Sequence, residues 1–176
     1  MLLNKLPVLD KGYVAYLDSS SNIKLLNDVA LEFFKKTDGK FLTELSTLTI
    51  VIKCPLFVQC NLSLFNMKIL ATPADEAEAY IPNVGEIGTP EHDTNKLIAD
   101  DMMRTTEALL INPKAYQHDG ANRFISQVLM PVSTYTTLIV HGSYNDWRAF
   151  CNQNNLPNPI KGYVDAVNQI MKMEWR

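Results

Sequence analysis

The 176-residue sequence has few arginines, no long apolar run and no excess of positive charge. Its 16 basic residues are mostly lysines, they face 19 acidic residues, and the formal net charge is −3. This balance argues against a broad basic face that binds nucleic acid. No apolar run approaches the roughly 18 residues that a membrane-spanning helix needs. The first residues lack the charged start and long apolar core of a secretory signal, so we expect a cytoplasmic protein without a membrane partner.

The sequence also lacks the short motifs that mark common catalytic and metal sites. Its three cysteines form no CxxC pair, which indicates a reducing compartment and buried, inert thiols. Its three histidines are scattered without the spacing of metal ligands, so no metal site is predicted. Neither common glycine-rich phosphate loop is present, and no GxSxG nucleophile motif occurs. Nothing orients His141 and Cys151 as a base and a nucleophile, and we interpret Cys151 as a core residue.

What remains is typical of a globular protein, with 47% apolar and 20% charged residues. The length fits a single domain over 1–176. Apolar spacing and strand-forming residues predict an α+β fold, in which a small, mostly antiparallel sheet packs with helices. The expected strands are 12–17 and 132–140. The expected helices are 23–36, 95–111 (ended by Asn112-Pro113), 121–130, one capped by Ser143 and one from about 160.

Residues 45–65 are rich in Ile, Val, Thr and Phe, which favours strand over helix. Pro55 lies in the middle of this run and cannot donate a ladder hydrogen bond. We therefore expect an edge strand, a bulge or two successive strands here.

Residues 71–93 form a predicted long loop with six acidic residues and no lysine or arginine. Long loops in compact domains are usually functional or disordered. Two interpretations stay open, a solvated or disordered segment and a lid over a site.

Three blocks of sequence, in order, resemble the flavin-dependent thymidylate synthases: VLDKGYVAYLD, LTIVIKCPLFVQ and QVLMPVSTYTTLIVHGSYNDWRAF. The most specific parts are the K-x-P-L-F-V motif at 53–58 and the P-x-x-x-Y-T motif at 131–136. The resemblance spans most of residues 8–174. It implies that family's fold and a homotetramer with sites between subunits.

The polar signature that binds flavin and deoxyuridylate in that family is missing here. Its Arg-Gln pair falls on Cys60 and Asn61, and its Arg-His-Arg falls on Leu64, Phe65 and Asn66. Each lost arginine removes a charge-assisted contact of about 1.5–3 kcal/mol. Since about 1.4 kcal/mol is tenfold in affinity, losing several costs many orders of magnitude. The resemblance therefore implies the fold, with no catalytic residue and no cofactor.

Two functions of different classes follow. The first is a catalytically silent relative that acts as an oligomeric scaffold, interaction or regulatory protein. The alternative is an enzyme with altered activity on C5 of a pyrimidine deoxynucleotide, by methylation or hydroxymethylation, with FAD as cofactor. A third role, binding a ligand that is not a nucleotide, is also open. A rebuilt nucleotide site would use Ser133, Asn145, Asn154 and Lys161. The compactness and divergence of the sequence would suit a phage or mobile-element gene.

Overall fold

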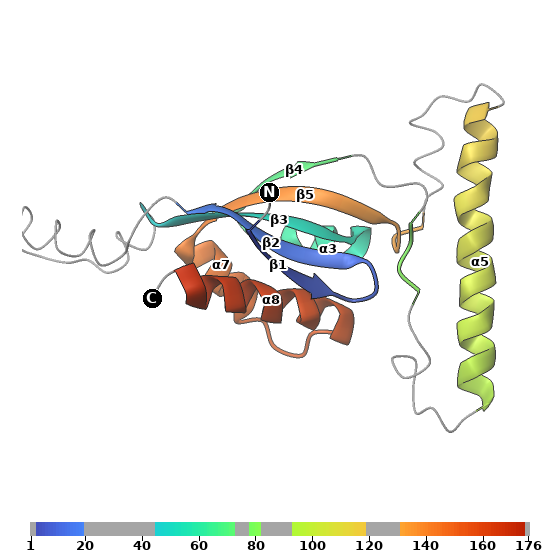
Figure 1. Cartoon of the computed structure of the whole chain (residues 1–176). Helices are drawn as coiled ribbons and strands as arrows, with labels where there is room; N and C mark the ends of the chain where they lie inside the picture. The colour runs from blue at the N-terminus through green and yellow to red at the C-terminus, as the bar shows by residue number, and fades with distance from the viewer. Residues whose placement is uncertain (1–2, 20–44, 73–77, 82–92, 119–130, 175–176) are drawn as a thin grey trace, which may run out of the picture.

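The computed structural model of the chain describes residues 3–19, 45–72, 78–81, 93–118 and 131–174. Within these ranges it contains one five-stranded antiparallel sheet and four helices, which confirms the predicted α+β class (Figure 1). The helices predicted over 23–36 and 121–130 lie outside the described residues, as does most of the predicted acidic loop. None of the helices in the described ranges is both long and apolar enough to cross a membrane.

The strands lie in the order β1-β2-β3-β5-β4, and each is antiparallel to its neighbours. Their bounds are Leu3–Val8 (β1), Gly12–Ser19 (β2), Thr47–Pro55 (β3), Lys68–Ala71 (β4) and Tyr135–Ser143 (β5). The strands predicted over 12–17 and 132–140 correspond to β2 and β5. Strand β1 was not predicted, and Pro7 is tolerated in it because β1 is at the edge of the sheet.

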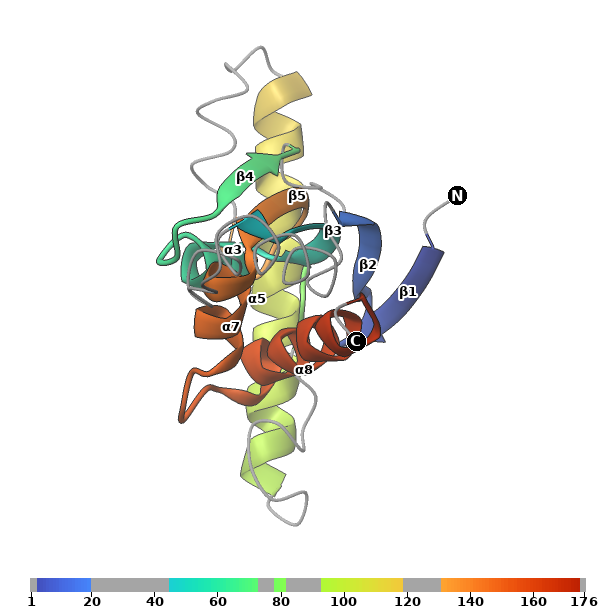
Figure 2. The same cartoon turned by 90° about the vertical axis from the view of Figure 1, so that its left-hand side faces the viewer.

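Two helices cover one face of the sheet, α7 (Tyr144–Cys151) and α8 (Asn158–Glu174), as Figures 1 and 2 show. Successive strand residues point to opposite faces, so alternate residues of β3 meet this helical layer. The indole nitrogen of Trp147 donates to the Leu48 carbonyl at 3.0 Å, which ties α7 to β3. The fully buried side chains of this core include Leu48, Ile50, Ile52, Leu138, Val140, Trp147, Phe150, Tyr163, Val167 and Ile170.

The prediction that residues 56–65 continue the β-structure is wrong. Residues 56–62 form helix α3 (Leu56–Leu62), and β3 is a central strand rather than an edge. Pro55 is the last residue of β3 and precedes the helix in an extended conformation, so its missing N–H breaks no ladder. The first amides of α3 donate to the Thr134 and Val132 carbonyls, each at 3.0 Å. Tertiary contacts thus override the local strand preference.

Helix α5 (Asp93–His118) continues through Pro113, so the prediction that Asn112-Pro113 ends it is wrong. A proline removes one intrahelical hydrogen bond and bends a helix without always ending it. In Figure 1, α5 stands apart from the sheet, beyond the end where β3 stops and β5 starts. Every α5 side chain that the structure describes is exposed, except the partly buried Thr106.

The helix predicted after Ser143 is α7, and its cap is confirmed. The Ser143 hydroxyl accepts from the Asp146 amide at 3.2 Å, and the Asp146 carboxylate accepts from the Ser143 amide at 3.1 Å. This reciprocal capping box fixes where β5 ends and the helix begins. The last predicted helix is α8, which begins at Asn158 rather than near 160.

Candidate functional site

Ionisable side chains gather at the end of the sheet where β3 stops and β5 starts. We call Asp10, Lys53, Glu78, Tyr135 and Tyr163 the sheet-end cluster. The Tyr135 hydroxyl donates to Asp10 Oδ1 at 2.6 Å, and the Tyr163 hydroxyl donates to the Lys53 carbonyl at 3.0 Å. Lys53 Nζ pairs with the Glu78 carboxylate and lies 5.6 Å from the centre of the Tyr135 ring. The cluster thus joins the β1–β2 turn, β3, β5, α8 and the segment 78–81.

The electrostatics of this cluster suit a structural role. Burial raises the pKa of Tyr163 well above its ordinary value. Burial, followed by the hydrogen bond to Asp10, raises the pKa of Tyr135 in the same way. Both phenols therefore stay protonated at neutral pH and act as hydrogen-bond donors, not as bases. The charge of Lys53 is balanced by Glu78, so the one lysine of the cluster is already paired with a carboxylate.

The segment 78–81 completes the edge of the sheet at this end. The Tyr135 amide donates to the Glu78 carbonyl at 2.9 Å, and the Tyr80 amide donates to the Ser133 carbonyl at 2.8 Å. Just before it, the Thr72 amide donates to the Thr137 carbonyl at 2.9 Å. Residues 68–72 thus pair with β5, and residues 78–80 pair with the start of β5 and the residues just before it. This part of the predicted acidic loop is built into the sheet.

A second polar surface lies between α7 and α8. A cavity of about 400 Å³ is lined by Asn154, Lys161 and eight further residues, four of them polar amides: Gln153, Asn155, Asn158 and Asn168. A neighbouring cavity of about 240 Å³ includes Tyr144, Arg148 and Lys172. Both are lined by Cys151, whose thiol pKa is raised to about 12 by burial and then by Asp165. Cys151 is partly buried rather than a fully buried core residue, and its thiol stays protonated at neutral pH.

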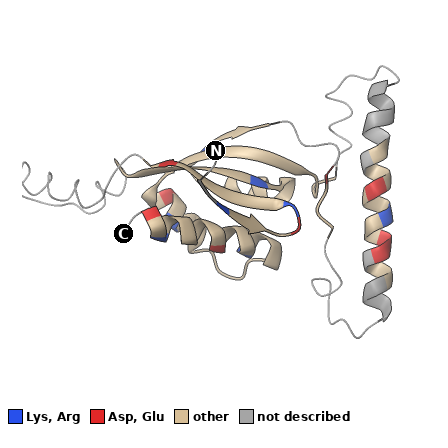
Figure 3. Ribbon diagram, in the orientation of Figure 1, with Lys and Arg blue, Asp and Glu red and all other residues tan. Residues whose placement is uncertain are grey.

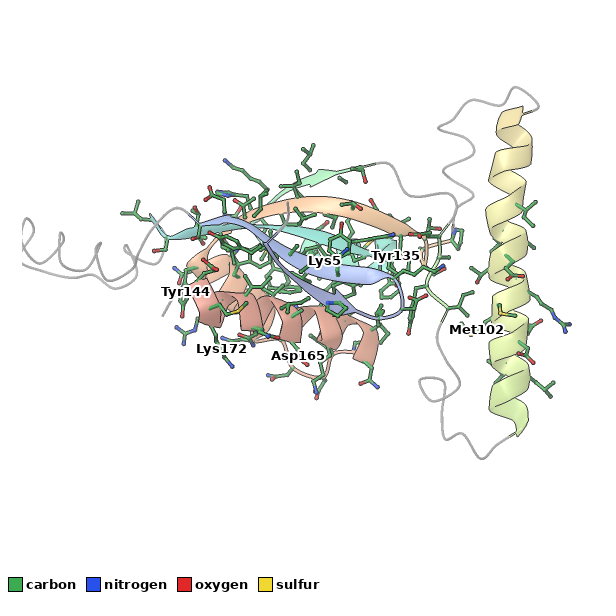
Figure 4. The ribbon with its side chains drawn as sticks, viewed as in Figure 1. Lys5, Met102, Tyr135, Tyr144, Asp165 and Lys172 are labelled. Atoms are coloured by element: carbon green, nitrogen blue, oxygen red, sulfur yellow. The ribbon has the colours of Figure 1, made fainter. Side chains whose placement is uncertain are left out.

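Within a single copy of the chain, the four residues proposed for a nucleotide site lie apart. Asn154 and Lys161 line the larger α7–α8 cavity. Ser133 lies before the start of β5, and Asn145 follows its end, in the first turn of α7. A nine-residue strand is about 30 Å long, so Ser133 and Asn145 lie at opposite ends of the sheet. Figure 4 shows the same separation, with Tyr135 at one end and Tyr144 at the other.

The positions that match the family's flavin signature are used for packing. The side-chain amides of Asn61 and Gln153 bond to each other twice, each time at 3.2 Å. Phe65 packs edge-on against Phe150 with 5.6 Å between ring centres. Cys60 and Leu64 are exposed on the surface. These neutral side chains supply no charged donor for the diphosphate of FAD, so at these positions the residues do not fit that cofactor.

Sequence reasoning did not single out the sheet-end cluster, although three of its five members lie in the matched blocks. Lys53 and Tyr135 belong to the two most specific motifs, and Asp10 belongs to the first block. Those blocks carried the fold prediction. In the structure Tyr135 bonds to Asp10, whereas Lys53 bonds to Glu78 and Tyr163, which lie outside the blocks. Within the described ranges, no group of three side chains could hold a metal ion.

The overall structure is similar to that of a known nucleotide methylase. The UMP/dUMP methylase PolB from Streptomyces cacaoi with 5-Br dUMP gives a TM-score of 0.70 at 14% identity, covering 96% of this chain and 92% of that one. The same methylase with 5-Br UMP gives a TM-score of 0.72 at 15% identity, covering 97% and 91%. No protein-family model and no curated protein matches the sequence. The chain therefore has a flavin-dependent thymidylate synthase-like fold.

Proposed function

We propose that this chain is an assembly-forming protein that keeps the thymidylate synthase-like fold without performing thymidylate synthase chemistry. It would act as a scaffold, interaction or regulatory subunit. The observation that carries the proposal is α5, a 26-residue helix that stands apart from the sheet and whose described apolar side chains are exposed. Most helical stability in proteins comes from tertiary packing, so a helix of this kind needs a partner.

The polar residues support the same conclusion. Two of the four proposed nucleotide contacts lie in a cavity between α7 and α8, and the other two lie at opposite ends of β5. Two arginines have side chains within the described part of the chain. They are Arg104 on α5 and Arg148 on α7, and both are exposed. An anionic nucleotide requires several donors that converge on one phosphate, and a single copy of this chain does not bring these residues together.

The resemblance suggests that the assembly is a homotetramer, since a protein can keep a self-complementary interface after it has lost catalytic activity. The test is light scattering after size-exclusion chromatography, with an absorption spectrum of the same fractions. We expect a colourless protein that elutes as an oligomer. Neither FAD nor deoxyuridylate should change its melting temperature. A monomer at micromolar concentration would contradict the proposal, and so would a flavin spectrum in the purified protein.

A second function is favoured by one specific observation, the likeness to a UMP/dUMP methylase over more than nine-tenths of both chains. It is modification of C5 of a pyrimidine deoxynucleotide, by methylation or hydroxymethylation, with FAD bound between subunits. Ser133, Asn145, Asn154 and Lys161 would then contact the nucleotide.

This second function has its own test. Deoxyuridylate would raise the melting temperature of the FAD-treated protein, and Asn154→Ala or Lys161→Ala would abolish that shift while leaving the unliganded melting temperature unchanged. Gln169→Ala is the matched control, because Gln169 is exposed on α8 and lines neither cavity. A ligand shift that survives both alanine variants would exclude these residues as nucleotide contacts.

A further inference from the structure

The seam between α7 and α8 carries an excess of basic side chains along its two cavities. The two helices hold charges of both signs (Figure 3). All three of their basic residues, Arg148, Lys161 and Lys172, line a cavity, whereas only Asp165 of their three acidic residues does so. The seam is therefore locally positive in a chain whose formal net charge is −3, and it attracts anions.

The smaller cavity, of about 240 Å³, has the composition of a phosphate site. Arg148 of α7 and Lys172 of α8 both line it, and none of its seven described lining residues is acidic. Figure 4 shows Tyr144 and Lys172 at the same end of the helix pair. The Arg148 guanidinium makes no ion pair or hydrogen bond with any side chain that the structure describes. Its planar fork of donors matches phosphate oxygens, and the side-chain amides of Asn152 and Asn168 belong to the same cavity.

The larger cavity, of about 400 Å³, is suited to hydroxyl groups. Five of its ten described lining residues carry a side-chain amide: Gln153, Asn154, Asn155, Asn158 and Asn168. A side-chain amide both donates and accepts hydrogen bonds, as a sugar hydroxyl does. Lys161 and Asp165 add one charge of each sign, so this lining is close to neutral. None of these ten residues is aromatic, so they offer no ring on which a nucleobase stacks.

The two cavities form one groove, because Cys151 and Asn168 line both. Together they reach the roughly 300–1,000 Å³ of a small-molecule site. We propose that this groove binds a phosphorylated sugar, with its phosphate between Arg148 and Lys172 and its hydroxyls against the amides of the larger cavity. Arg148 and Lys172 line one cavity within a single copy of the chain, which the four residues proposed for a nucleotide site do not. The site adds a ligand to the proposed function, and binding at it does not depend on self-assembly.

Isothermal titration calorimetry with glucose 6-phosphate, fructose 6-phosphate and ribose 5-phosphate tests the site. Glucose, inorganic phosphate and UMP are the comparison ligands. Arg148→Gln removes the fork of donors, and Asn168→Ala removes the amide that lines both cavities. Arg104→Gln and Gln169→Ala are the matched controls, because both residues are exposed and line neither cavity. The melting temperature without ligand verifies that each variant is folded.

We expect at least one sugar phosphate to bind at least tenfold more tightly than glucose and than inorganic phosphate. Arg148→Gln and Asn168→Ala should each weaken that binding at least tenfold, and the controls should change it less than twofold.

Three results would overturn the inference: no binding of any of the three sugar phosphates at millimolar concentration, normal binding by both groove variants, or binding of inorganic phosphate or UMP that is as tight as that of the sugar phosphates. An oligomeric protein without this binding leaves the proposed function standing. A monomer that binds a sugar phosphate through Arg148 contradicts only the proposed function.

Discussion

At the scale of single residues, Gly12 shows how closely β2 and α8 approach each other. A Cβ atom at this position would collide with the Tyr163 hydroxyl and would lie 2.8 Å from the Val8 carbonyl and 2.9 Å from the Lys53 carbonyl. We predict that Gly12→Ala destabilises the fold by about 1–3 kcal/mol, measured by urea denaturation, because the core is already full.

Two further variants make this prediction specific. Adding Tyr163→Phe to Gly12→Ala should restore only part of the stability, since it removes the hydroxyl but leaves both carbonyls in place. Gly162→Ala should cost clearly less than Gly12→Ala, because its Cβ would meet only a Val8 methyl group at 3.1 Å and alanine favours the helix. Equal losses for Gly12→Ala and Gly162→Ala would contradict the explanation.

The buried tyrosines give a second prediction at this scale, a loss of stability in alkali. An unfolded tyrosine has a pKa near 10, and the pKa values of Tyr135 and Tyr163 are raised above this in the folded chain. Above about pH 10 the unfolded state thus binds fewer protons than the folded state, and stability falls by up to about 1.4 kcal/mol per pH unit for each tyrosine.

Denaturation curves between pH 8 and pH 11 measure this slope. Tyr163→Phe should reduce the alkaline slope while it lowers stability at pH 8 by about 1 kcal/mol, the contribution of one hydrogen bond. A slope that is unchanged in both Tyr163→Phe and Tyr135→Phe would show that other groups control alkaline unfolding.

At the scale of secondary-structure elements, the capping box of α7 is the local feature most open to test. Ser143→Ala removes the acceptor for the Asp146 amide, and we predict a loss of about 1 kcal/mol in the free energy of unfolding. Ser63→Ala is the control, because the Ser63 hydroxyl donates to the Gln59 carbonyl at an exposed site. That variant should stay within about 0.5 kcal/mol of the wild type. Similar losses in both would mean that the α7 cap adds no particular stability.

The elements also show what the sequence could and could not predict. Strands β2 and β5 and helices α7 and α8 were predicted because apolar spacing and capping residues act locally. Helix α3 was missed because its Val and Phe favour strands, whereas its first amides find acceptors only in residues 132–134. The prediction that helix α5 ends before Pro113 was wrong, because a proline weakens a helix without always ending it. The sheet-end cluster joins residues up to 125 positions apart, a pairing that no local pattern encodes.

At the scale of the whole molecule, self-assembly should appear in the melting temperature. A partner that binds only the folded state stabilises it by mass action. Over a hundredfold rise in protein concentration we therefore predict an increase of about 5 °C, measured by scanning calorimetry. Met102→Asp puts a charge on the exposed apolar surface of α5, so this variant should show little of this dependence. A melting temperature that is the same at every concentration would argue for a stable monomer.

The pairing of β3 with β5 has a consequence for synthesis on the ribosome. Pro55 pairs with Tyr135, 80 positions later, and Thr47 pairs with Ser143 at a greater separation still. At translation rates of about 5–20 residues per second, β3 emerges about 4–16 s before its partner strand β5. During that interval one side of β3 can pair with β2, but its other side has no partner and is a template for wrong pairing. Slow closure of this long loop, rather than helix formation, should therefore limit both the folding rate and the yield of newly made protein.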